Sequence, residues 1–200
     1  MSQQRIVVTG FGRCGSSMAM QMLHAGGVPC IGPWPIFEEP SFAQTNPARF
    51  WEACGGQAVK ILNLHYFGGL PDNTARVIYM TRQPDQQARS TAMFMQLMCD
   101  IDLNRQKRRK LERSLISDRE PMRAALAGSP VLTMSFERVL SNPTEAASML
   151  HGFVAPAFPG FDPTAAASAV RKRSPKAQGM AEEILGVAAS MRDIKNTRVI

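Results

Sequence analysis

Short apolar runs alternate with segments of helical periodicity along this 200-residue chain. The runs at 6–8 and 76–81 are rich in β-branched residues and have the length of buried strands. Shorter runs at 28–31, 58–62 and 131–134 fit the same pattern. Because strands and helices alternate, we expect a mainly parallel central sheet in a three-layer α/β/α fold.

Glycine, proline and capping residues mark the ends of the expected helices. Gly26 and Gly27 end the first, and one long helix is expected from Asp85 through the basic stretch to residue 116. Pro121 can open the next, and Asn142 suits the start of another. Further helices are expected after residues 164 and 175. The sequence has no internal repeat or linker, so residues 1–200 are expected to form a single domain.

Basic residues outnumber acidic ones, and most of the surplus is local. The formal net charge of +7 suggests anionic ligands. Residues 105–113 hold six cations and one acid, or +5, which leaves +2 for the rest of the chain. Such a run is usually a solvated helix face, although an acidic acceptor or nucleic acid could dock there. No aromatic residue interleaves with it, which argues against nucleic acid.

The cysteines and the apolar runs bear on compartment and membrane. Cys14, Cys30, Cys54 and Cys99 form no C-x-x-C pair and no metal-ligand spacing with histidine. We therefore expect free thiols and no bound metal. No apolar run approaches the roughly 20 residues that cross a bilayer, and the start of the chain lacks the pattern of a secretory leader. These features predict a cytoplasmic protein without a membrane partner.

The most informative stretch is 9–17, Thr-Gly-Phe-Gly-Arg-Cys-Gly-Ser-Ser, between the first strand and the first helix. Glycines in such a turn let successive backbone N–H groups point inward, and the helix adds its unpaired N-terminal donors and positive dipole end. The stretch therefore predicts a site for an anion, most plausibly phosphate or sulfate.

The spacing of Gly10 and Gly15 matches a Walker-type phosphate loop, but Ser16 stands where that motif has lysine. Arg13 brings the cation inside the loop instead. The strand at 76–81 leads to an arginine and supplies no aspartate that could help to hold Mg²⁺. Both departures argue against Mg-nucleotide hydrolysis, although a kinase or other phosphotransferase on this fold stays open as an alternative.

Cys14 raises a second hypothesis, the nucleophile of a cysteine phosphatase, because the loop and the helix dipole could lower the pKa of its thiol. Those enzymes need an arginine that closes the same loop a few residues after the thiolate. Met18, Met20 and Gln21 follow here. A small residue packed within the loop is the simpler interpretation.

A second signal lies where the central strand ends. Arg82 follows the strand, Pro84 can start a helix, and Ser90 lies two turns into it. An arginine, with its planar fork of donors, and a hydroxyl that converge from a strand end and a helix suit an anion.

Together the two signals resemble the PAPS-dependent sulfotransferases, whose donor is 3′-phosphoadenylyl sulfate. In that family a loop like 10–17 binds the 5′-phosphosulfate, and an Arg-x7-Ser element after a central strand binds the 3′-phosphate. Arg82 and Ser90 stand at that spacing. The segment 131–143 is similar to the strand–Glu–Asn-Pro–helix region of the family. Gly12 and Cys14 depart from the Pro and Ser that are common there.

The resemblance implies a fold like that of P-loop nucleoside triphosphate hydrolases, with PAPS as co-substrate and PAP as product. It implies that Arg13 stabilises the leaving phosphate as a catalytic cation, and that Arg82 acts on the opposite end of the nucleotide. The nucleotide-binding residues expected from it are Gly12, Arg13, Cys14, Gly15, Ser16, Ser17, Arg82 and Ser90.

Two segments of the sequence offer candidates for the general base on the acceptor side. Some sulfotransferases use a histidine shortly after the third strand, and His65 lies five residues past Lys60, a looser spacing than the family's Lys-x-His. Others use a glutamate in the loop after the first helix, where Glu38 and Glu39 fall. A hydroxyl or amine acceptor, on a small molecule or a carbohydrate, is expected. The chain is therefore interpreted as a sulfotransferase, with a phosphotransferase or a non-catalytic nucleotide binder as alternatives.

Overall fold

The computed structural model describes residues 4–38, 47–70 and 75–171. Its centre is a four-stranded parallel sheet in the order β2-β1-β3-β4. The strands are β1 (Arg5–Gly10), β2 (Ala58–Lys60), β3 (Ala75–Thr81) and β4 (Val131–Ser135). In this order the loop after β1 lies between the ends of β2 and β3, so the predicted anion loop and Arg82 meet at the carboxyl edge of the sheet.

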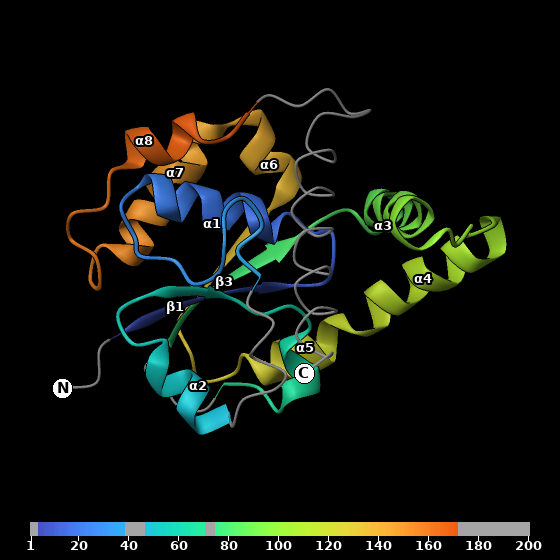
Figure 1. The fold of residues 1–200 in the computed structure, drawn as a ribbon, viewed down its shortest axis with the longest axis horizontal. Helices are drawn as coiled ribbons and strands as arrows, with labels where there is room; N and C mark the ends of the chain where they lie inside the picture. The colour runs from blue at the N-terminus through green and yellow to red at the C-terminus, as the bar shows by residue number, and fades with distance from the viewer. Residues whose placement is uncertain (1–3, 39–46, 71–74, 172–200) are drawn as a thin grey trace, which may run out of the picture.

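Helices cover both faces of the sheet, which confirms the three-layer α/β/α expectation (Figure 1). On one face lie α1 (Ser16–Ala25), α6 (Phe136–Ser141), α7 (Pro143–Val154) and α8 (Pro163–Ser168). On the other lie α2 (Pro47–Ala53), the short 3-10 helix η2 (Leu64–Phe67) and α5 (Arg119–Ala125). Helices α3 (Pro84–Cys99) and α4 (Arg105–Ser117) extend away from the carboxyl edge.

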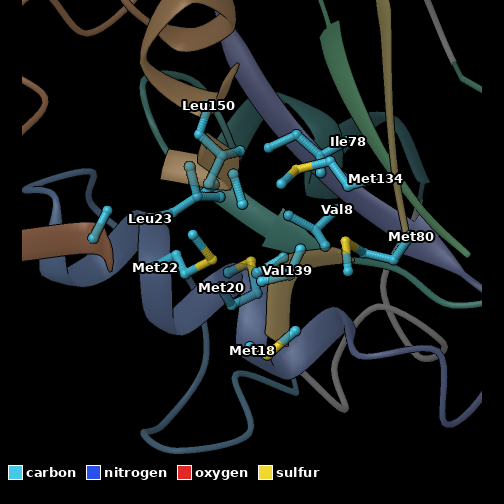
Figure 2. Close-up of a cluster of buried hydrophobic side chains, with 14 of the residues drawn as sticks. Val8, Met18, Met20, Met22, Leu23, Ile78, Met80, Met134, Val139 and Leu150 are labelled. Carbon is cyan, nitrogen blue, oxygen red and sulfur yellow. The ribbon is translucent and has the colours of Figure 1, made fainter. Parts of the chain in front are cut away.

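Strand residues alternate between the two cores, as the period of two requires. Val8 and Ile78 pack beneath α1 and α7, in a core rich in methionine that includes Met18, Met20 and Met22 (Figure 2). Val7, Val77 and Tyr79 face the opposite core with α2 and α5. Every residue of β1, the strand that leads into the glycine loop, is buried.

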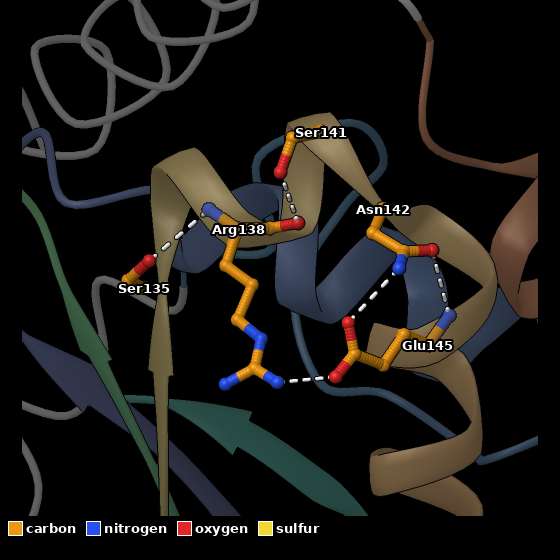
Figure 3. Close-up of polar contacts among 5 residues, drawn as sticks. All are labelled: Ser135, Arg138, Ser141, Asn142 and Glu145. Carbon is orange, nitrogen blue, oxygen red and sulfur yellow. Dashed lines mark hydrogen bonds and ion pairs between the residues drawn. The ribbon is translucent and has the colours of Figure 1, made fainter.

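Capping side chains explain why the chain turns sharply after β4 (Figure 3). The hydroxyl of Ser135 accepts the N–H of Arg138 and begins α6. The side chain of Asn142 accepts the N–H of Glu145 and begins α7, with Pro143 at its first position. Arg138 and Glu145 form an ion pair that joins the two helices.

Two sequence expectations about secondary structure are wrong. The run at 28–31 forms only an isolated bridge, Cys30 to Ala58, because Pro29 lacks the N–H that a longer ladder needs. The long helix expected from Asp85 is two helices, because Asp100 adopts a left-handed conformation (φ 54°) and the side chain of Asn104 caps the start of α4. The helix expected after residue 175 lies outside the described residues.

Candidate functional site

Two glycines fix the path of the loop between β1 and α1. A Cβ at Gly10 would lie 2.5 Å from the carbonyl oxygen of Met80, so β3 leaves no room for a side chain. Gly15 has a φ of 98°, and a Cβ there would lie 2.6 Å from the ring of Phe136. A Cβ at Gly12 would meet no atom within 4 Å. The loop is thus closed toward the sheet and open at Gly12.

Gln87 braces this loop from helix α3. Its side chain is buried, and its amide nitrogen donates to the carbonyl oxygens of Phe11 at 3.2 Å and Gly12 at 2.8 Å. Sequence reasoning missed this residue. The signal was present, since helical spacing from Pro84 places Gln87, Thr91 and Phe94 on one face of α3.

The loop forms one wall of a cavity of about 280 Å³. Three cations and one carboxylate border it, so its formal lining charge is +2, which favours an anionic ligand. Apolar side chains from α3 and the segment after β2 form the facing wall. The lining residues are Gly12, Arg13, Gly15, Ser16, Ser17, Glu38, Lys60, Leu62, Arg82, Thr91, Phe94, Met95 and Phe136.

The two predicted arginines lie together at this cavity. Arg13 has a positive φ of 67°, its Nε donates to the hydroxyl of Ser90 at 3.4 Å, and its guanidinium lies 5.2 Å from the ring centre of Phe94. Arg82 donates from Nη1 to the carbonyl oxygen of Arg13 at 3.2 Å and lies 4.3 Å from the ring centre of Phe136. Arg13, Arg82 and Ser90 therefore form one cluster, whereas the sequence suggested two separate groups.

Lys60 joins the loop to the acceptor-side glutamate, a connection that sequence reasoning did not find. Its ammonium donates to the hydroxyl of Ser17 at 3.2 Å and to the carbonyl oxygen of Ile36, and it pairs with Glu38 at 3.2 Å. The Lys60 side chain is 2% exposed and that of Glu38 is 44% exposed. The lysine is thus a fixed internal cation, and the carboxylate faces both it and solvent.

Cys14 lies beneath the loop and not in the cavity lining. It is 1% exposed, and burial raises the pKa of its thiol to about 11, against smaller lowering effects of hydrogen bonds at Ser16 and the charge of Lys60. The expectation that the loop and helix dipole could lower this pKa is therefore wrong, because desolvation of the thiolate is the larger effect. Burial and the raised pKa of this thiol both argue against its use as the nucleophile of a phosphatase.

The other candidate bases are placed differently. His65 is outside the cavity lining, with its ring edge-on to Phe11 at 5.8 Å and close to Tyr66 at 4.0 Å. Both of its ring nitrogens are buried and have no hydrogen-bond partner among the described residues. Glu39 lies outside the described residues. Of the two predicted bases that the structure describes, Glu38 borders the cavity and His65 does not.

A second hollow, of about 790 Å³, lies on the other side of Arg82, along β4 and α5. Arg119 and Arg123 border it, but no residue of the glycine loop does. Although this hollow is larger, the smaller cavity is bordered by the glycine loop and by the buried cation Lys60, and fixed positive charge is what anion chemistry needs. Volume alone does not locate the site.

The described part of the chain contains neither a candidate metal site nor a candidate membrane span. No group of three His, Cys, Asp or Glu side chains is placed to hold a metal ion there. None of its helices is both long and apolar enough to span a bilayer.

Comparison with known proteins identifies the fold. No protein-family model and no curated protein matches the sequence. Among solved structures, mouse sulfotransferase SULT7A1 complexed with PAP is similar over 86% of this chain and 64% of its own, with a TM-score of 0.57 and 12% identity. Retinol dehydratase in complex with androsterone and inactive cofactor PAP is similar over 83% of this chain and 63% of its own, with a TM-score of 0.51 and 12% identity.

The coverage and the identity of these two structures limit what their similarity shows. This chain spans less than two thirds of the length of either structure. At 12% identity they show the fold alone. The chain has the α/β fold of these two structures, with a parallel sheet between layers of helices, and this is the kind of fold that the sequence resemblance predicted.

Proposed function

We propose that this chain is a PAPS-dependent sulfotransferase, which transfers a sulfuryl group from PAPS to a hydroxyl or amine and releases PAP. The observation that carries the proposal is the cluster of Arg13, Arg82 and Ser90 beside the glycine loop at the cavity. Both similar structures contain PAP, which supports the same nucleotide here. Residues 1–200 are proposed to form one such domain.

A nucleotide with two separate phosphate groups suits this cluster. We assign the backbone N–H groups of Gly15, Ser16 and Ser17, together with the two serine hydroxyls, to the 5′-phosphate side. The N–H of Cys14 is left out, because it donates to the carbonyl oxygen of Phe11 at 3.1 Å. Arg82 and Ser90 are assigned to the 3′-phosphate. We assign Arg13 a position between the 5′- and 3′-phosphates. Arg82 donates a hydrogen bond to the backbone carbonyl oxygen of Arg13, and the Arg13 side chain reaches Ser90. The packing of each guanidinium on an aromatic ring keeps it in place before the ligand arrives.

The proposed chemistry needs fixed positive charge where the leaving phosphate gains negative charge. Arg13 and the N–H groups of the loop supply it from a preorganised site, and no reorganisation is required at the moment of transfer. Lys60 adds a buried cation behind Ser17. Its hydrogen bonds to Ser17 and Ile36 fix its position, so it acts on the loop and not as a mobile surface charge.

Glu38 is the proposed general base. A base must lie within hydrogen-bond reach of the proton that it takes, and Glu38 borders the cavity. Lys60 is the proposed positioning residue for its carboxylate. The ring of His65 is held between Phe11 and Tyr66, so it is not assigned a role. The acceptor is proposed to be a small molecule or a carbohydrate.

Calorimetric titration of the whole chain tests the proposal. We expect PAP to bind at least about tenfold more tightly than AMP, because a charge-assisted hydrogen bond to the additional phosphate contributes about 1.5–3 kcal/mol. Equal affinity for PAP and AMP would contradict the proposal. Tighter binding of Mg-ATP than of PAP, with turnover, would instead support a phosphotransferase. Tight PAP binding without transfer from PAPS to any hydroxyl or amine tested would indicate a non-catalytic binder.

A further inference from the structure

The second part of α3, the turn after it and α4 form an extension that we call the arm, residues 93–117. Figure 1 shows it extending beyond the carboxyl edge of the sheet, with α4 running back from its tip to α5. Leu115 of the arm is buried in the core beside α5, but four of the exposed large apolar side chains in the described residues also belong to the arm. They are Met93, Leu97, Ile101 and Ile116.

The cations of α4 are not used in the fold. Among the described residues, none of them forms an ion pair with a carboxylate, whereas Arg89, Arg123 and Arg138 elsewhere do. The only side-chain hydrogen bond described for this set runs from Arg113 to the carbonyl oxygen of Arg109, at 3.4 Å. The set is Arg105, Lys107, Arg108, Arg109, Lys110 and Arg113.

Their spacing makes a linear array. Arg105, Arg109 and Arg113 recur every four residues, are exposed, and therefore lie along one side of α4 at intervals of roughly 6 Å. A row of this kind matches a ligand with repeated negative charges better than one small anion. Binding of an anionic ligand to this row costs little free energy, because these cations have no carboxylate partner among the described residues that the ligand must displace.

The arm leads directly to the cavity. Thr91, Phe94 and Met95 of α3 line the cavity, while Met93 and Leu97 of the same helix are exposed on its outer side. A long ligand that lies on the arm and bends around α3 would bring one segment to the cavity that Glu38 and the glycine loop border. Since such a ligand is a candidate acceptor, the arm and the cavity are two parts of one substrate path.

We infer that the arm is the docking surface for an acidic polysaccharide, a chain that carries a carboxylate on successive sugars and offers its hydroxyls to the cavity. This inference rests on the proposed function and narrows its acceptor class. Carboxylates pair with the arginine row, and the apolar faces of sugar rings pack on the exposed side chains of α3.

Two other polyanionic partners fit the arm less well. A single-stranded nucleic acid would need aromatic side chains on which its bases stack. The arm has one, Phe94, which lies in the cavity lining under Arg13. An anionic membrane would need apolar residues flanked by cations, but the exposed Asp100 and Asp102 flank Ile101 at the turn between the helices.

Binding and transfer to alginate, a polymer of uronic acids, test the inference. We expect the wild-type chain to bind alginate, but not uncharged dextran, at low salt and to label alginate with radioactive sulfate from PAPS. The double variant Arg109→Gln/Arg113→Gln should bind alginate about tenfold or more weakly, since each lost contact removes an ion-pairing, salt-sensitive contribution. Its KM for alginate should rise while its PAP affinity stays that of wild type.

The matched control is Arg49→Gln/Arg123→Gln, which removes two exposed arginines from α2 and α5. It should bind alginate as wild type does, and an equal loss in both variants would overturn the inference in favour of general charge attraction. PAP binding without alginate binding would overturn the inference alone. Failure of PAP binding would overturn the proposed function and the acceptor assignment with it. Equal or tighter binding of an oligonucleotide or of anionic vesicles, sensitive to the same arginines, would replace the polysaccharide with that partner.

Discussion

The cavity and the arm both concentrate arginine and lysine, but they hold these residues in opposite ways. At the cavity, Lys60 is buried and hydrogen-bonded, and Arg13 and Arg82 each pack on an aromatic ring. On the arm, Arg109 and Arg113 point to solvent without a carboxylate partner among the described residues. Fixed charge suits recognition of one ligand geometry, whereas exposed charge attracts any polyanion and is screened by salt.

The largest effect is expected where the backbone itself is fixed. Gly10→Ala would place a methyl group 2.5 Å from the carbonyl oxygen of Met80. Overpacking and backbone strain should together lower the free energy of unfolding by about 3 kcal/mol or more, and PAP binding should be lost. Gly12→Ala is the control, because its Cβ would meet no atom within 4 Å. Urea unfolding measures both, and equal stabilities would contradict the described loop.

A smaller loss is expected when the buried cation is removed. Lys60→Met leaves the carbonyl oxygen of Ile36 and the Glu38 carboxylate without this donor, which should cost about 1–3 kcal/mol of stability. Lys107→Met makes the same substitution at an exposed position of α4 and should change stability by less than about 0.5 kcal/mol. Thermal unfolding compares the two variants. Similar melting temperatures would show that Lys60 is not an internal cation.

Two thiols extend the comparison to reactivity. Burial raises the pKa of Cys14 to about 11, whereas Cys99, at the end of α3, is exposed. An alkylating reagent at pH 8 should therefore modify Cys99 quickly and Cys14 only after unfolding. Peptide mass spectrometry after timed labelling identifies the modified residues. Equally fast labelling of Cys14 would place its thiol in contact with solvent.

The raised pKa of Cys14 predicts how the free energy of unfolding changes with pH. Because its pKa is raised on folding from about 9 to about 11, the protonated form favours the folded state. This contribution is fully present below pH 9 and is lost as the pH rises from 9 toward 11. The unfolding free energy of Cys14→Ala should thus fall less steeply over this interval than that of wild type, and Cys99→Ala should behave as wild type.

The smallest effect on stability is expected on the arm. Arg109→Gln/Arg113→Gln should change the free energy of unfolding by less than about 0.5 kcal/mol, since neither side chain has an ion-pair partner in the described part of the chain. Urea unfolding of the double variant against wild type measures it. A loss above 1 kcal/mol would mean that these arginines stabilise the fold and are not kept for a ligand.

Local signals in the sequence predicted much of the fold. The apolar run of β1, the glycine loop and the end of α1 at Gly26 were all predicted, because periodicity and glycine chemistry act within a few residues. The break between α3 and α4, residues 100–104, was missed, since the apolar spacing continues across it and the left-handed conformation of Asp100 has no clear signal in the sequence. The run at 28–31 was wrongly predicted as a strand, because its apolar pattern outweighed Pro29, which lacks the N–H that a longer ladder needs.

Long-range contacts explain what was missed at the site. Lys60 and Glu38 lie 22 residues apart, and Arg13 and Ser90 lie 77 apart, so no spacing rule links them. The choice between Glu38 and His65 depended on which one the fold turns toward the cavity. Residue types predicted the chemistry of the loop, but only the packing of α3 and β2 against it shows which side chains it meets.

The preference for PAP over AMP in the variant Arg82→Gln is the most direct test of the central claim. Both ligands carry the 5′-phosphate, so any disturbance of the loop through the lost hydrogen bond to Arg13 affects them alike. The account predicts that the wild-type preference, about tenfold or more, falls to near unity in Arg82→Gln and stays intact in Arg123→Gln. An undiminished preference in Arg82→Gln would contradict it.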